Sequence, residues 1–115
     1  MVTRIKSGSR MSQAVVHGNT VYLAGQVASD TSADTADQTR QILATIDGLL
    51  AEAGTDKRHV LAATVYLTDM STFNEMNAAW EAWIAPGCAP TRATVGAPLA
   101  SSAYRVEIVM TAARP

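Results

Sequence analysis

The segment HVLAATVYLT, from His59 to Thr68, constrains the fold more than any other part of the chain. It is apolar and rich in β-branched residues on both of its faces, which predicts a strand inside a sheet that is covered on both sides. The residues before it are typical of an amphipathic helix from about Thr35 to Ala53, which ends at Gly54. The apolar positions of this helix recur at helical spacing and are Ile42, Leu43, Ile46, Leu49, Leu50 and Ala53.

A hairpin, a second helix and two later strands complete the predicted elements. Gly18 and Asn19 tolerate the positive φ of a tight turn, and they separate two β-rich runs. Thr72 and Glu75 have the spacing of a capping box, which predicts a second helix from there to about Ala85. The expected strands are Ala14 to Val16, Thr20 to Gln26, Thr91 to Ala97 and Tyr104 to Ala112, with a further short strand at Thr3 to Lys6.

This order of elements predicts an α+β fold with one mixed sheet and both helices on one face. Local reasoning pairs the last two strands as a hairpin, because they are neighbours in the sequence. Several strands look apolar on both sides, and charged residues make up only 17% of the chain. We therefore infer that the uncovered face of the sheet packs against other copies of the same chain.

Composition and charge narrow the class of protein. The 115 residues, 48% of them hydrophobic, suit one folded domain that spans residues 1–115. The nine Lys and Arg residues are scattered and the net charge is −1, which argues against nucleic acid as a partner. No signal peptide or membrane span is expected, and the single Cys88 fits a reducing compartment, so a cytoplasmic location is predicted.

Arg92 and Glu107 most strongly suggest a functional site, because each lies in a β-rich run where an unpaired charge is costly. Arg92 shares a strand face with Thr94 and Gly96, whose small size leaves room beside a guanidinium that can hold a carboxylate bidentately. That carboxylate belongs either to a small anionic ligand or to the protein. Glu107 either pairs with a cation such as Arg105 or Arg92, or is desolvated and available for proton transfer.

Asn77 and the two tryptophans lie on the apolar stripe of the second predicted helix. The amide of Asn77 needs partners there, which are either backbone groups or a ligand. Trp80 and Trp83 could form an aromatic box for a ligand, but their helical spacing favours packing in the core or in an interface.

The two histidines and the cysteine carry weaker signals. His17 and His59 match no metal-binding motif, and a turn or surface role is the simpler interpretation. Cys88 lies in the turn PGCAP, without the basic neighbours or helix N-terminus that would activate a thiolate.

Four motifs follow one another along nearly the whole chain: GNTVYLAGQVA, MNAAWEAW, APTRATV and YRVEIVM. Together they resemble the RidA/YjgF family of reactive-intermediate deaminases. The resemblance implies a chorismate-mutase-like fold whose last strand lies between earlier strands, so we expect this topology instead of the local hairpin. It also implies a homotrimer with three clefts between subunits.

The resemblance further implies an activity and a set of site residues. Family members hydrolyse small 2-imino or 2-enamino acids to 2-oxo acids and ammonia, with no metal or cofactor. By resemblance, Arg92 holds the substrate carboxylate and Glu107 orients or protonates around the attacking water. Asn77 and Gly25 would border the cleft.

Three positions depart from the family pattern and remain candidate substrate contacts. Met11 stands where an aromatic residue is usual, Ala24 where a serine is usual, and Thr94 belongs to a strand that often carries a cysteine. Two readings therefore compete with a deaminase: a non-catalytic module that binds carboxylate metabolites, and a holdase-like protein that exposes apolar surface. The expected partners are a small 2-imino or 2-oxo acid and other copies of this chain, with no nucleic acid and no membrane, although the binding module could also dock to a partner.

Overall fold

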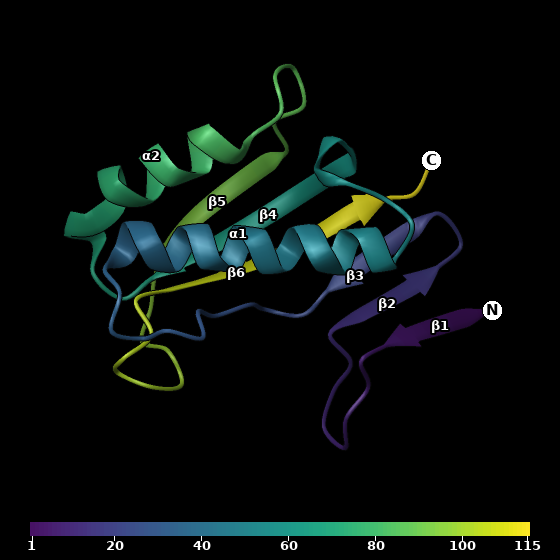
Figure 1. The fold of residues 1–115 in the computed structure, drawn as a ribbon, viewed down its shortest axis with the longest axis horizontal. Helices are drawn as coiled ribbons and strands as arrows, with labels where there is room; N and C mark the ends of the chain where they lie inside the picture. Colours follow the sequence, from purple (N-terminus) through teal and green to yellow (C-terminus); the bar gives the residue numbers. More distant parts are fainter.

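The protein folds around one six-stranded mixed sheet, as a computed structural model of all 115 residues shows (Figure 1). The strand order is β1-β2-β3-β6-β4-β5, in which β4 and β5 are parallel and every other pair is antiparallel. Both helices lie on the same side of the sheet, as predicted. The strands are β1 (Val2–Ile5), β2 (Ala14–His17), β3 (Thr20–Leu23), β4 (Val60–Leu67), β5 (Thr91–Gly96) and β6 (Val106–Ala113).

The last strand, β6, lies between β3 and β4, which are consecutive strands in the sequence but do not pair with each other in the sheet. This arrangement confirms the topology that the family resemblance implied, and the locally expected hairpin of the last two strands is wrong. β5 instead pairs in parallel with β4, and its other edge is free. The parallel pair requires a crossover, which the second helix supplies.

The first helix, α1 (Thr35–Glu52), begins and ends as its sequence predicts. The side chain of Asp34 accepts a hydrogen bond from the backbone of Asp37, as an N-cap does. At the other end, Gly54 adopts φ +85°, and Thr55 N donates to Leu50 O at 2.9 Å. These bonds form a Schellman motif, which a glycine at this position favours.

The second helix, α2 (Phe73–Trp83), begins in a different way from the one predicted. Thr72 makes no side-chain capping bond, so the capping box with Glu75 is wrong. The chain instead enters α2 through a short 3-10 turn, Met70–Thr72, whose N-cap Asp69 accepts a bond from Ser71 N. The Thr72 hydroxyl donates to Asp69 O at 2.7 Å, which leaves it turned away from the helix.

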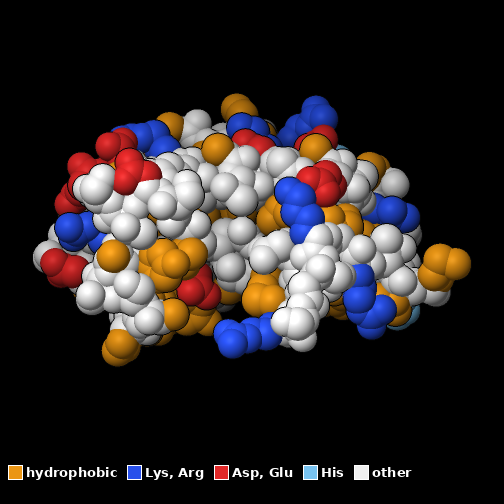
Figure 2. Space-filling model, turned by 60° about the horizontal axis from the view of Figure 1, so that its bottom comes forward, with side chains coloured by type: hydrophobic (Ala, Val, Ile, Leu, Met, Phe, Trp, Pro, Cys, Tyr) orange, Lys and Arg blue, Asp and Glu red, His pale blue; other side chains and the backbone are white.

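The core lies between the two helices and the sheet. Residues of β6 alternate strictly between buried and half-buried positions, because one face meets the helices and the other does not. The open face has large apolar side chains that remain exposed, including Tyr22 at 50% and Val95 at 42%. Figure 2 shows hydrophobic side chains reaching the surface on the lower side of the molecule, with basic and acidic side chains between them.

Strand ends differ from expectation mainly near position 26. The second strand of the hairpin ends at Leu23 rather than Gln26, and Gln26 then makes an isolated bridge to Ile108 of β6. A two-residue break therefore separates the hairpin from this bridge, and Gly25 lies within it. Neither helix is long and apolar enough to cross a membrane.

We expect substitution by alanine to have opposite effects on the free energy of unfolding at Gly54, which ends α1, and at Gly48, which lies within it. Gly54→Ala should lower the free energy of unfolding by about 1–2 kcal/mol, because a Cβ disfavours the left-handed conformation. Gly48→Ala should raise it by about 0.5–1 kcal/mol, because Gly48 is exposed within the helix and no atom lies within 4 Å of the added methyl.

Chemical denaturation at one fixed protein concentration measures both changes, since association with other copies would shift apparent stability. A neutral Gly54→Ala variant would contradict the cap assignment.

Candidate functional site

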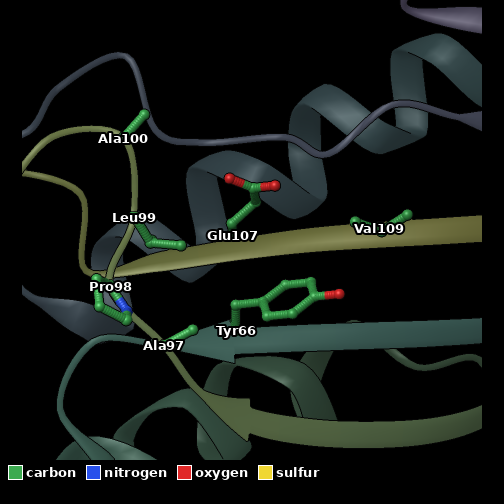
Figure 3. A pocket seen from close by; sticks show the side chains of 7 residues that line it. All are labelled: Tyr66, Ala97, Pro98, Leu99, Ala100, Glu107 and Val109. Carbon is green, nitrogen blue, oxygen red and sulfur yellow. The ribbon is translucent and has the colours of Figure 1, made fainter.

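Glu107 lies at the edge of a cavity on the open face of the sheet. The cavity has a volume of about 310 Å³ and its lining is mostly apolar. Figure 3 shows the Glu107 carboxylate directed away from β6, with Tyr66 below it and Leu99 pointing toward the space beside them. Tyr66 is the direct partner of Glu107 in the β4–β6 register. The other lining residues are Ala97, Pro98, Ala100 and Val109.

The carboxylate of Glu107 has no partner within the chain. It forms no ion pair, since the four ion pairs of the chain involve other residues, and no side-chain hydrogen bond. The predicted pairing with Arg105 or Arg92 is therefore wrong for a single chain. The remaining sequence alternative, a desolvated carboxyl group that is available for proton transfer, stays a prediction, and Glu107 is half-buried in the structure.

Gly25 packs directly against the Glu107 carboxyl group. A methyl group built at Gly25 would lie 2.9 Å from Glu107 Cδ and closer still to Oε2, so a side chain there would collide with the carboxylate. The position of Gly25 is fixed by the neighbouring bridge, in which Gln26 N donates to Ile108 O at 2.9 Å and Ile108 N donates back at 3.1 Å. The sequence motif that contains Gly25 thus keeps space for the acid on β6.

Arg92 lies on the opposite side of the sheet, beneath α2. It pairs in register with Ala63, a buried residue of β4 that faces the helices. Its guanidinium carbon lies 5.1 Å from the ring centroid of Trp80 and 5.8 Å from that of Phe73, and Nη1 lies 3.8 Å from Met76 Sδ. These are cation–π distances. The sequence suggested that the small neighbours on β5 leave room beside the guanidinium. In the structure, the rings of Trp80 and Phe73 occupy part of that room, and Arg92 remains partly exposed.

No carboxylate pairs with Arg92, although it is partly buried. Burial lowers the pKa of its guanidinium, and the charge of Glu81 acts in the opposite direction. The alternative in which a carboxylate of the same chain neutralises Arg92 is therefore wrong for a single chain. Aromatic faces attract the cation but leave its hydrogen-bond donors largely unused.

Arg92 and Glu107 cannot hold the same small molecule within one chain. They lie on opposite faces, on strands separated by β4, which places them about 10 Å apart across the sheet. Along β4, their partners Ala63 and Tyr66 are three residues apart, which adds about 10 Å in the strand direction. The cavity at Glu107 is correspondingly not bordered by Arg92.

The other candidate residues divide between these two regions. The hydroxyl of Thr94 is buried, shares the helix-facing side of β5 with Arg92, and has no hydrogen-bond partner. Asn77 is half-buried rather than fully buried, and its side chain makes no hydrogen bond within the chain. Ala24 precedes Gly25 and its backbone N donates to Gln13 O, while Met11 is 49% exposed in the loop after β1.

The tryptophans pack as the sequence predicted. Trp80 and Trp83 are buried, with ring centroids 5.9 Å apart, and Trp83 Nε1 donates to Asp47 of α1 at 3.0 Å. They therefore join the two helices. The sequence analysis missed the contact between Trp80 and Arg92. This contact joins α2 to β5, and the spacing of residues within the helix does not predict it. His59 Nδ1 lies 3.0 Å from Asp56 Oδ1 in the turn before β4, a structural role.

Comparison with known proteins matches nearly the whole length of this chain to related proteins. Residues 1–114 match the family model described as endoribonuclease L-PSP. A RutC family protein of Haemophilus ducreyi is 48% identical over 98% of this chain and 97% of its own length. The RutC family protein YoaB of Escherichia coli is 43% identical over 97% of each chain.

Solved structures show the same fold. NMB1025, a YjgF family member from Neisseria meningitidis, superposes with a TM-score of 0.97 at 43% identity, covering 100% of this chain and 96% of its own. Rv2704 from Mycobacterium tuberculosis, of the YjgF/YER057c/UK114 family, gives 0.89 at 29% identity, covering 98% and 99%. The strand order, the two helices on one face and the structural matches thus define a small α+β protein with two helices on a mixed sheet. The chain belongs to the RidA/YjgF family.

The close approach of Gly25 to Glu107 generates a prediction about stability. Gly25→Ala should lower the free energy of unfolding by about 1 kcal/mol, because the Glu107 side chain must leave its present rotamer. In a Glu107→Ala background the same change should cost little, because the obstacle is gone. A double-mutant cycle by denaturation measures this coupling.

The matched control is Gly8→Ala, whose added methyl would meet only Met11 O at 3.7 Å. It should show no coupling to Glu107→Ala. Additive effects of Gly25→Ala and Glu107→Ala would show that the two residues do not contact each other.

Proposed function

We propose that this protein hydrolyses small 2-imino or 2-enamino acids to 2-oxo acids and ammonia, without a cofactor. The observation that carries the proposal is that Arg92 and Glu107, one cation and one anion in β-strands, both lack a partner of opposite charge within the chain. A half-buried charge without a partner is costly, so a ligand or another copy of the chain that supplies one would be favoured. Membership of the RidA/YjgF family supports the assignment.

The active unit of this proposal is a homotrimer, with each site between two copies. Because Arg92 and Glu107 lie on opposite faces of one sheet, a substrate that touches both must lie between different chains. Two features support such an assembly: the free edge of β5, and the exposed apolar residues of the open face. In this arrangement, Arg92 of one copy faces Glu107 of the next.

The proposed chemistry needs only binding and proton transfer. The Arg92 guanidinium holds the substrate carboxylate through two hydrogen bonds, and the hydroxyl of Thr94 offers a further donor. Water adds to the imine carbon while Glu107 accepts its proton and returns a proton to nitrogen. The resulting carbinolamine expels ammonia, so that one imine and one water give one 2-oxo acid and one ammonia. The apolar lining of the cavity favours short aliphatic substrate side chains.

The name of the matching family model raises a second activity, RNA cleavage. Recognition of RNA depends on neutralising phosphates and stacking bases. This chain has nine Lys and Arg residues against ten Asp and Glu residues. The aromatic side chains Trp80 and Trp83 are buried. We therefore favour a small anionic substrate.

Substitution of Arg92 tests the proposal directly. In an assay with freshly generated 2-iminobutyrate, Arg92→Ala should lower kcat/KM by about 100-fold, because a bidentate carboxylate contact is lost. Arg92→Lys should fall between this variant and the parent, since it keeps the charge but not the planar fork. Arg40→Ala, which removes an exposed arginine of α1, is the control and should match the parent.

Three outcomes separate the candidate functions. Imine loss at the buffer rate, with saturable binding of 2-oxobutyrate, would favour the non-catalytic carboxylate-binding module, which the departures at Met11 and Ala24 also favour. Absence of both would contradict any Arg92-centred function. Suppression of aggregation of an unfolded client, unchanged in Arg92→Ala, would favour the holdase-like alternative.

Mixed assemblies test the site between copies. Arg92→Ala and Glu107→Gln chains should each be nearly inactive alone, but trimers formed from both by co-expression should regain activity. With random mixing, about one quarter of the sites combine an intact Arg92 from one copy with an intact Glu107 from another. If the co-expressed chains are no more active than either variant alone, Arg92 and Glu107 of the same chain would form the site. That result would contradict the proposed site between copies.

A further inference from the structure

Gln38 is a polar residue in the interior of the molecule, on the first turns of α1. Its exposed fraction is 0%, and it is one of four buried polar residues in the chain. Glutamine is rarely fully buried, and a buried amide destabilises a core unless each of its polar atoms is satisfied. The neighbouring Thr39 is equally buried, but it bonds only to Thr35 O within the same helix. The partners of Gln38 lie elsewhere.

The amide of Gln38 joins α1 to two other segments: the turn just before the helix, and residues 103–105, which are distant in the sequence. Nε2 donates to Ala33 O and to Ala103 O, both at 3.1 Å, and lies 3.4 Å from Thr31 O. Oε1 accepts from Arg105 N at 2.9 Å. Two N–H donors and one acceptor are thus all used, and a flipped amide would place a donor against Arg105 N. The arrangement therefore has one orientation.

Two of these partners belong to the loop that forms one wall of the cavity at Glu107. We call residues 97–105 the wall loop; it contributes Ala97, Pro98, Leu99 and Ala100 to the lining. Its first residue is held to the sheet, because Ala97 N donates to Leu67 O at 3.0 Å. At its other end, the link from Ala103 O to the body of the protein is the bond from Gln38. Arg105 O also accepts from Thr68 N at 3.2 Å, so the second end of the wall loop is held both by the end of β4 and by the amide of Gln38 on α1.

Glu107 itself is held by bonds that do not involve Gln38. Its neighbour Ile108 exchanges two backbone bonds with Gln26, and Glu107 pairs with Tyr66 across the β4–β6 ladder. Loss of the Gln38 amide should therefore loosen the wall without displacing the carboxylate. The wall contributes contact area to a bound molecule, whereas the carboxylate contributes proton transfer, so the two functions can be separated by experiment.

We propose that Gln38 is a positioning residue that fixes the wall loop over the Glu107 cavity and thereby sets the affinity for substrate. The kinetic part of this inference rests on the proposed deaminase function, and the structural part does not. The residue touches no substrate: it acts through Ala103 and Arg105 on the apolar wall formed by Pro98 and Leu99.

The experiment compares Gln38→Met, which is similar in shape but cannot make these hydrogen bonds, with Thr39→Val. The second variant removes a buried side-chain bond from the same turn of α1 without touching the wall loop. Both are compared with the parent well below their unfolding temperatures, by hydrogen exchange of residues 97–105, by KM and kcat with 2-iminobutyrate, and by the Kd for 2-oxobutyrate.

We expect Gln38→Met to speed exchange in the wall loop and to raise KM and Kd about tenfold, since tenfold is about 1.4 kcal/mol and a lost buried hydrogen bond is of that order. kcat should change less than threefold. Thr39→Val should leave exchange in residues 97–105, KM and Kd as in the parent. In Gln38→Glu, acidification should partly restore the parent KM, because a protonated carboxyl group can donate to Ala103 O while its carbonyl oxygen accepts from Arg105 N.

Each other result overturns the proposal or part of it. Unchanged exchange in residues 97–105 of Gln38→Met would show that the wall does not depend on this amide. Faster exchange with unchanged KM and Kd would show that the wall does not set affinity. Equal effects in Thr39→Val would reduce Gln38 to a general role in the core. If the parent neither deaminates nor binds 2-oxobutyrate, the proposed function fails, and hydrogen exchange still decides whether Gln38 holds the wall.

Discussion

The placement of β6 between β3 and β4 is the constraint on which the rest of this structure depends. This placement pairs β6 with β3 of the early hairpin on one side and with β4 on the other. The last strand of the chain therefore joins the two halves of the sheet. It leaves β5 at the edge, with one unpaired side. It also directs Glu107 to the open face and returns the chain over that face through the wall loop. The placement of β6 therefore accounts for the cavity, for the position of Glu107 at its edge and for the wall loop beside it.

The same sheet separates the two charges that first suggested a site. Arg92 faces the helices and rests on the rings of Trp80 and Phe73, whereas Glu107 faces away and rests against Gly25. Neither charge is neutralised by an opposite charge in its own chain. Their shared lack of a partner has a common physical consequence: each gains from an oppositely charged group that comes from outside the chain. The proposed site between copies follows from this geometry, because the carboxylate of one small molecule can then meet Arg92 while its imine group meets a neighbour's Glu107.

Much of the fold was predictable because its signals are local. The apolar spacing of α1, the glycine that ends it and the β-rich segments depend on residues within a few positions of each other, and each of these elements was found where expected. The capping box predicted at Thr72 was wrong although its spacing was right. Asp69 caps the preceding 3-10 turn, and the Thr72 hydroxyl donates to Asp69 O instead of capping α2. Gln38 carried no sequence signal, since a glutamine early in an amphipathic helix is ordinarily a surface residue. Its partners Ala103 and Arg105 lie 65 and 67 residues away.

The sequence by itself determined which residues carry unusual charge, where helices and strands form, and that both helices cover one face of a mixed sheet. These properties follow from side-chain polarity and backbone preference, which act over short distances along the chain. Only the tertiary structure decided that Arg92 and Glu107 lie on opposite faces, that aromatic rings lie beside the guanidinium, that Gly25 contacts the acid, and that Gln38 bonds to residues 103 and 105. Such contacts depend on strand register and on the order of strands in the sheet, which set neighbours across tens of residues.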